Sequence, residues 1–82
     1  MMQDVLDEEM QAILKIIGRN VEARRQELGL SQSEAAHAAG ISRHTLCDIE
    51  QGKKNFRYLT IEAIAQALDT TFAELIKDRL PE

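Results

Sequence analysis

The stretch SQSEAAHAAGISRHTLCDIEQG, residues 31–52, decides the fold that the sequence predicts. Ser31 and Glu34 have the spacing of a capping box, in which each side chain hydrogen-bonds the backbone N–H of the other. Gly40 can adopt the left-handed conformation that ends a helix at little cost. The stretch therefore predicts a short helix at Gln32–Ala39, followed by a tight turn.

A second helix is expected from Arg43 to about Gln51, with Ser42 as its N-cap. At about 100° per residue, Leu46 and Ile49 lie on one face. That face is expected to pack inward together with Ala35, Ala39 and Ile41. The opposite face is polar and carries Arg43, His44, Cys47, Asp48 and Gln51. Two short helices arranged in this way are typical of a helix-turn-helix, whose second helix lies in the DNA major groove.

With their flanks, these residues resemble the phage-repressor and Cro-like (XRE-type) domains of bacteria and phages. The resemblance extends to IGRNVEARRQELGLSQ at 17–32, IEQGKKN at 49–55 and TIEAIAQALDTTFAEL at 60–75, most of the chain. It implies an all-α fold, a compact bundle of five or six helices of the lambda-repressor-like DNA-binding type with a central helix-turn-helix. We expect this domain at residues 17–80, after an acidic amphipathic extension at residues 1–16.

Length and composition limit the alternatives. Eighty-two residues are enough for one domain, and 44% hydrophobic residues indicate a globular chain. The single cysteine, Cys47, excludes an internal disulfide framework and fits a reducing compartment. The first residues, MMQDVLDEEM, show neither a signal peptide nor a membrane span. The expected compartment is the cytoplasm.

The net charge of −4 argues at first against nucleic acid, but the charge is unevenly distributed. Residues 17–57 carry seven basic and five acidic side chains, whereas the segments on both sides are acidic. The positive excess coincides with the helix-turn-helix and its flanks, as nucleic-acid binding requires. The excess is small, so phosphate contacts should need a second copy of the domain or strong base contacts.

The N-terminal segment from Asp4 to about Ile17 is expected to be helical. Its apolar residues recur at three- and four-residue steps, at Val5, Leu6, Met10, Ile13, Leu14 and Ile17. It would either pack on the domain as an extra helix or take part in a dimer interface. Gly18 would either separate it from the next helix or weaken one continuous helix.

The first helix of the resembled family is expected at Arg19–Leu28, with Ile17, Val21 and Leu28 in the core. The family commonly places an arginine at the position of Arg25, paired with a glutamate at the position of Glu50. A buried charge is tolerated only when it is paired, so a buried pair is expected here. The alternative is two separate surface residues. Arg19 and Arg24 are expected in solvent or near phosphate.

Two further helices are expected after the loop. The first covers Thr60–Leu68, with Ile61, Ile64, Ala65 and Leu68 inward. The last runs from Phe72 to about Arg79, after a second capping box formed by Thr71 and Glu74. Its apolar residues exceed what so small a core needs. They predict a homodimer interface at Phe72, Leu75, Ile76 and Leu80.

The resemblance also implies where the domain touches double-stranded DNA. It implies that base edges are contacted by Arg43, His44, Thr45 and Asp48. Arginine can donate two hydrogen bonds to guanine, and aspartate can accept one from the cytosine amino group. The resemblance assigns the backbone to Gln32 and Ser42. The polar loop after the second helix is expected to bind phosphates through Lys53, Lys54, Asn55 and Arg57. The alternative for that loop is a solvated cationic segment.

No catalytic or cofactor site is expected. His44, Cys47 and Asp48 lie about one turn apart, but structural zinc usually needs four ligands. Nucleophilic catalysis through Cys47 would need an ordered base and an oxyanion site, and His44 is its only near partner. No small-molecule effector domain is expected either.

The sequence favours a transcriptional regulator that binds a palindromic operator as a homodimer. A stand-alone domain of this size resembles the controller proteins of restriction–modification systems; a phage repressor or an antitoxin subunit would look similar. The rival is a protein-interaction module that keeps the fold without the DNA contacts.

Overall fold

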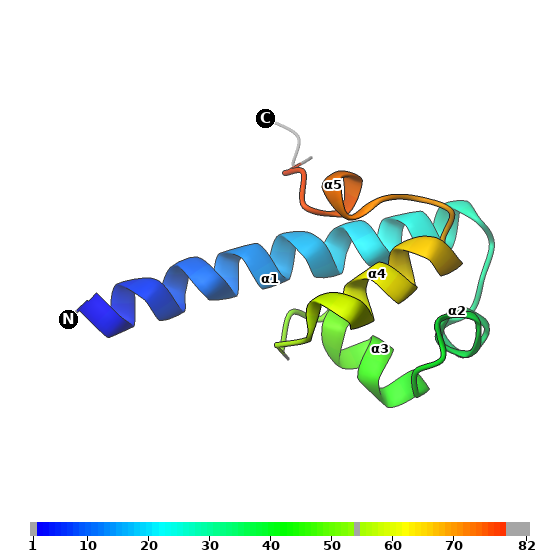
Figure 1. The fold of residues 1–82 in the computed structure, drawn as a ribbon, viewed down its shortest axis with the longest axis horizontal. Coiled ribbons are helices and arrows are strands. Elements are labelled where there is room, and N and C mark those ends of the chain that lie inside the picture. Colours follow the sequence, from blue (N-terminus) through cyan, green and yellow to red (C-terminus); the bar gives the residue numbers. More distant parts are fainter. Residues whose placement is uncertain (1, 54, 79–82) are drawn as a thin grey trace.

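The computed structural model describes residues 2–53 and 55–78, with side chains from Glu8 onward. Within these residues the chain is all-α: α1 (Met2–Glu27), α2 (Gln32–Ala39), α3 (Arg43–Glu50), α4 (Tyr58–Ala67) and α5 (Phe72–Leu75) (Figure 1). The expected all-α bundle with a central helix-turn-helix is therefore confirmed. No helix of the described chain has the length and apolar character needed to cross a membrane.

The helices enclose one core of small aliphatic side chains. Every helix contributes to it. The buried members are Ile17, Val21, Ala35, Ala36, Leu46, Ile49, Ile61, Ile64, Ala65, Leu68 and Leu75. The predicted inward faces of α2, α3 and α4 thus lie in the core, with Ala39 and Ile41 partly buried against it.

Helix α1 runs without a break through Gly18, so the N-terminal segment and the first family helix are one element. Gly18 is buried against the end of α3. A Cβ built on Gly18 would lie 2.6 Å from the carbonyl oxygen of Glu50 and closer still to that of Ile49. Gly18 therefore neither ends nor merely weakens the helix, because its missing side chain is what lets α3 approach α1.

The first half of α1 extends beyond the other helices (Figure 1). Its side chains are exposed from Glu8 to Ile13, and burial begins at Leu14. Met10 and Ile13 are among the large apolar side chains left on the surface.

The predicted placements of Leu28 in the core and of Arg24 in solvent or near phosphate are wrong. Leu28 is exposed rather than buried, because α1 ends at Glu27 and the chain turns at Gly29 with a φ of +70°. Leu30 packs on the core instead. Arg24 is not a free surface cation, since its Nε donates to the Leu68 carbonyl (2.8 Å) and Nη2 to that of Asp69 (3.2 Å). It thereby satisfies carbonyls at the end of α4.

The last helix is much shorter than expected. It ends at Leu75, and the predicted end near Arg79 lies outside the described residues. The Asn20 side-chain amide donates to the carbonyls of Leu75 (2.7 Å) and Lys77 (2.6 Å). A buried amide of α1 thus takes the Leu75 carbonyl, which a helix continuing to Arg79 would have used. Helix α4 begins two residues earlier than predicted, at Tyr58.

Gly18→Ala should destabilise the domain by about 1–3 kcal/mol or more, the range for overpacking a tight contact. Alanine is the better helix former by about 1 kcal/mol, so a loss of stability in Gly18→Ala would show that the close α1–α3 contact outweighs helix propensity. Urea denaturation measures the effect. Gln26→Ala, on the exposed face of α1, is the control and should change stability by less than about 0.5 kcal/mol. A stabilised Gly18→Ala variant would contradict the close contact.

Candidate nucleic-acid interface

Helix α2 begins and ends as its sequence predicts. The Ser31 hydroxyl accepts from the Glu34 backbone N–H (3.0 Å), and the Ser31 N–H donates to the Glu34 carboxylate (2.8 Å). The hydrogen bond from the Ser31 backbone contributes most to holding the pKa of Glu34 below its usual range, and the Ser31 side chain adds to it. Gly40, at φ 71°, ends the helix in the left-handed conformation. Both ends of α2 are thus fixed by their own side chains and backbone conformation.

Helix α3 begins at a cap that uses two of the predicted DNA-contacting residues. The Ser42 hydroxyl accepts from the Thr45 backbone N–H (3.0 Å) and donates to the Thr45 hydroxyl (2.8 Å). Leu46 and Ile49 are buried on the inner face. Ser42 therefore holds the start of the helix, and Thr45 is half-buried beside it.

The outer face of α3 brings together the other predicted base-contacting residues. Arg43 and His44 are exposed, and Asp48 is half-buried one turn beyond His44. The His44 Nε2 lies 3.3 Å from Asp48 Oδ2, an ion pair when the imidazole is protonated. His44 is therefore the neighbour that faces the Asp48 carboxylate on this helix.

Cys47 and Gln51 complete this face. The Gln51 amide donates to the Cys47 sulfur at 3.4 Å, and the thiol is half-buried. In the described part of the chain no three histidine, cysteine, aspartate or glutamate side chains gather as metal ligands would. The face is a mixed polar surface with donors and acceptors, as a base-reading helix requires.

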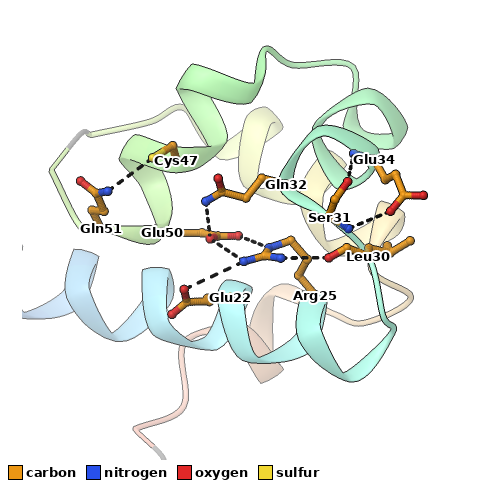
Figure 2. A network of polar contacts seen from close by, with 9 residues as sticks. All are labelled: Glu22, Arg25, Leu30, Ser31, Gln32, Glu34, Cys47, Glu50 and Gln51. Atoms are coloured by element: carbon orange, nitrogen blue, oxygen red, sulfur yellow. Dashed lines mark hydrogen bonds and ion pairs between the residues drawn. The ribbon is translucent and has the colours of Figure 1, made fainter.

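The end of α3 is tied to α1 by the predicted buried pair (Figure 2). Arg25 Nε donates to Glu50 Oε2 (2.7 Å) and Nη2 to Oε1 (3.2 Å). The Glu50 side chain is 3% exposed. The hydrogen bond to Glu50 raises the pKa of Arg25 against the opposing effect of burial. The expected buried pair is confirmed, and the alternative of two surface residues is excluded.

Gln32 is drawn into the same network. Its amide donates to Glu50 Oε1 at 3.0 Å, and its side chain is half-buried (Figure 2). Arg25 Nη1 also donates to the Leu30 carbonyl (2.9 Å), in the turn before α2. The carboxylate of the last residue of α3 thus accepts hydrogen bonds both from the first residue of α2 and from Arg25 of α1.

The predicted phosphate-binding loop is exposed after α3. Lys53, Asn55 and Arg57 lie on the surface, and Lys54 lies outside the described residues. The Asn55 side-chain oxygen accepts from the Phe56 N–H (2.9 Å), which leaves the Asn55 amide group as its donor. The described loop residues therefore offer two cations and one amide to an anionic partner.

The predicted dimer residues do not all lie on the surface. Leu75 is 2% exposed and belongs to the core, so it has almost no surface left for a partner. Phe72 is half-buried and Ile76 is exposed, whereas Leu80 lies outside the described residues. Apolar surface that the predictions missed lies at Tyr58, which is 61% exposed, and at Leu59, which is 78% exposed. The Tyr58 ring meets that of Phe72 edge-on, with centroids 5.6 Å apart.

A sequence signal for Leu59 did exist. It stands two residues before Ile61, off the inward face of α4, so an apolar residue there has no core to enter.

Comparisons with known proteins agree with this geometry. The family model HTH_3, described as "Helix-turn-helix", matches residues 21–75. The chain is 36% identical over 62 residues to the HTH-type transcriptional regulator y4dJ of Sinorhizobium fredii, covering 76% of this chain and 80% of that protein. It is 35% identical over 60 residues to the immunity repressor protein of Bacillus phage phi105, covering 73% of this chain but 42% of the repressor.

A solved structure gives a similar match. The restriction–modification controller protein C.AhdI from Aeromonas hydrophila superposes with a TM-score of 0.75 at 33% identity. The match covers 78% of this chain and 97% of the controller protein.

Glu50→Ala should cost on the order of 3–5 kcal/mol, because it leaves the Arg25 guanidinium buried without its carboxylate. Replacing both residues together, Arg25→Met with Glu50→Leu, should cost much less, since no charge then remains buried. Chemical denaturation of both variants measures the difference. A loss below about 1 kcal/mol for Glu50→Ala, as for surface pairs, would contradict the buried pair.

Proposed function

The chain belongs to the helix-turn-helix family of transcriptional regulators, and from that premise we propose that it binds double-stranded DNA in a sequence-specific manner. The binding unit is a homodimer on a palindromic operator. The observation that carries this proposal is the outer face of α3, whose polar side chains are presented to solvent while its inner face and its last residue are fixed in the core.

In this proposal Arg43 and His44 contact base edges, with Thr45 and Asp48 beside them. Arg43 is the first residue of α3 and is exposed, which suits a bidentate contact to guanine. Asp48 accepts from a cytosine amino group, and His44 offsets its repulsion from phosphates when protonated. Phosphates are bound by Gln32, Ser42 and the loop residues Lys53, Lys54, Asn55 and Arg57.

The role closest to these observations is that of a restriction–modification controller. The match to C.AhdI spans nearly all of that protein, whereas the phage repressor extends well beyond the match. Residues 17–80 would form the DNA-binding domain and residues 1–16 an extension to it. The proposal predicts genes for an endonuclease and a methyltransferase next to the gene for this chain.

A second function, a protein-interaction module or antitoxin subunit, draws support from the first half of α1. Its exposed Met10 and Ile13, beside the acidic Glu8 and Glu9, form a surface that DNA binding does not use. The sequence preference of the protein for DNA separates the two functions.

Arg43→Ala should weaken binding to the preferred operator by about 1–3 kcal/mol and relax the choice at one base-pair position. Lys53→Ala should weaken binding to all duplexes about equally. It should also reduce the salt dependence of the binding constant by roughly the amount that one phosphate contact contributes. Competition binding on a randomised operator library at two salt concentrations measures both variants.

Two outcomes of that experiment would count against the proposal. An unchanged selected sequence and affinity for Arg43→Ala would show that Arg43 does not read bases. A wild-type protein with no preference for any duplex at low salt would favour the protein-interaction function.

The homodimer is expected to use the apolar surface at Tyr58, Leu59, Phe72 and Ile76, with two α3 helices about 34 Å apart, one DNA turn. Leu59→Lys should shift the protein toward monomer, because it places a charge where apolar surface would be buried. Sedimentation at micromolar concentration measures the shift. Gln66→Lys, exposed further along α4, is the matched control. A wild-type protein that is monomeric with and without DNA would contradict the dimer.

A further inference from the structure

The apolar stripe of α1 continues past the edge of the core. Ile17 is 3% exposed, whereas Ile13 and Met10, on the preceding turns, are 48% and 46% exposed. Met10 and Ile17 are seven residues apart and therefore lie on nearly the same face of the helix, with Ile13 between them. We call these three residues the α1 seam. The domain covers only the C-terminal end of this seam.

The open end of the α1 seam is suited to a further helix. Its residues follow one another at steps of three and four, the spacing along which one helix packs against another. They lie on the half of α1 that extends beyond the other helices (Figure 1). Most of the stability of a helix in a protein comes from packing of its apolar face, and here that face is open to solvent.

The charge beside the seam is of one sign. Residues 2–13 include no lysine or arginine but four acidic residues, Asp4, Asp7, Glu8 and Glu9. At about 100° per residue, positions 7 and 9 border the open end of the seam on its two sides, and position 8 lies on the opposite face. An apolar stripe bordered by acidic positions is complementary to a helix whose apolar stripe is bordered by basic ones.

We propose that the open end of the α1 seam binds a cationic amphipathic helix of another protein. The apolar face of that helix covers Met10 and Ile13, and its basic residues lie beside the acidic positions of α1. The inference goes beyond the proposed DNA binding, because neither Met10 nor Ile13 belongs to the predicted DNA contacts. It supplies the chemistry of the partner that a protein-interaction function would need.

A second copy of the chain fits this surface poorly. Burial begins at Leu14, so a partner helix can cover α1 only over its first half. An antiparallel copy would therefore place the four acidic residues of one segment against those of the other, and like charges repel. A parallel copy would bring both domains to the same end and the same side, because Met10 faces the side on which Ile17 meets the core. The same acidic charge disfavours DNA as the occupant.

A designed peptide tests the inference on the full chain. The probe has about three heptads, with leucine at the a and d positions and lysine at the e and g positions. One control peptide carries glutamate in place of each lysine, and another has the composition of the probe in an order that gives no apolar face. We expect the probe to bind about 10-fold or more tightly than either control, measured by fluorescence anisotropy. Equal binding of either control would overturn the inference.

Substitutions on the two faces of α1 separate the seam from general attraction to an acidic protein. Met10→Gln with Ile13→Gln should weaken binding of the probe about 10-fold or more, because the apolar area that the probe covers is lost. Ala12→Gln, exposed and away from the seam, is the matched control and should bind like wild type. Glu9→Gln should weaken binding about 2- to 5-fold, and Glu8→Gln, on the far face, by less. A Met10→Gln, Ile13→Gln variant that binds the probe like wild type would contradict the seam.

A further measurement locates the site in the wild-type protein. The methyl signal of Met10, assigned by its loss in Met10→Gln, is followed by NMR during titration with the probe, and we expect it to shift. An unchanged signal with the probe bound would overturn the inference. So would sedimentation in which Met10→Gln with Ile13→Gln converts a wild-type dimer to monomer, because a second copy would then cover the seam. A wild type that selects no duplex would overturn the proposed DNA binding and leave the seam unaffected.

Discussion

The structure depends most on the buried ion pair between Arg25 and Glu50. It joins the long first helix to the last residue of the helix that would enter the DNA groove, at 2.7 and 3.2 Å. Neither charge could stay in this position alone, because an unpaired buried ion costs several kcal/mol. The pair therefore sets the angle between α1 and α3, and the hydrogen bond from Gln32 carries the same constraint to the start of α2.

Helix α1 acts as the scaffold on which the other parts are fixed. Gly18 lets the end of α3 come into backbone contact, while Asn20 holds the carbonyls of the C-terminal segment and Arg24 those at the end of α4. These three residues lie within two turns of a single helix. Polar groups buried in this way must be hydrogen-bonded, so each one specifies the position of its partner as well as stabilising it.

A rigid frame of this kind has a direct consequence for recognition. The outer face of α3 offers an arginine and a histidine paired with an aspartate, and a glutamine follows at its C-cap. The helix cannot tilt without breaking the buried pair. Base readout depends on hydrogen-bond geometry in the major groove, so a fixed helix supports discrimination. In the proposed function, the modest positive charge of the motif would leave a larger share of the affinity for DNA to these contacts and to the second copy in a dimer.

The sequence alone determined the limits of α2 and α3, the inward faces of the helix-turn-helix and the Arg25–Glu50 pair, because caps and helical periodicity are local and the pair belongs to the resembled family. It also identified the exposed residues Arg43, His44 and Lys53. Tertiary structure decided the role of Gly18, the exposure of Leu28, the burial of Leu75 and the early end of α5. The role of Gly18 and the early end of α5 follow from partners distant in sequence, Glu50 for Gly18 and Asn20 for the carbonyl of Leu75. No local pattern records which distant group will occupy a given space.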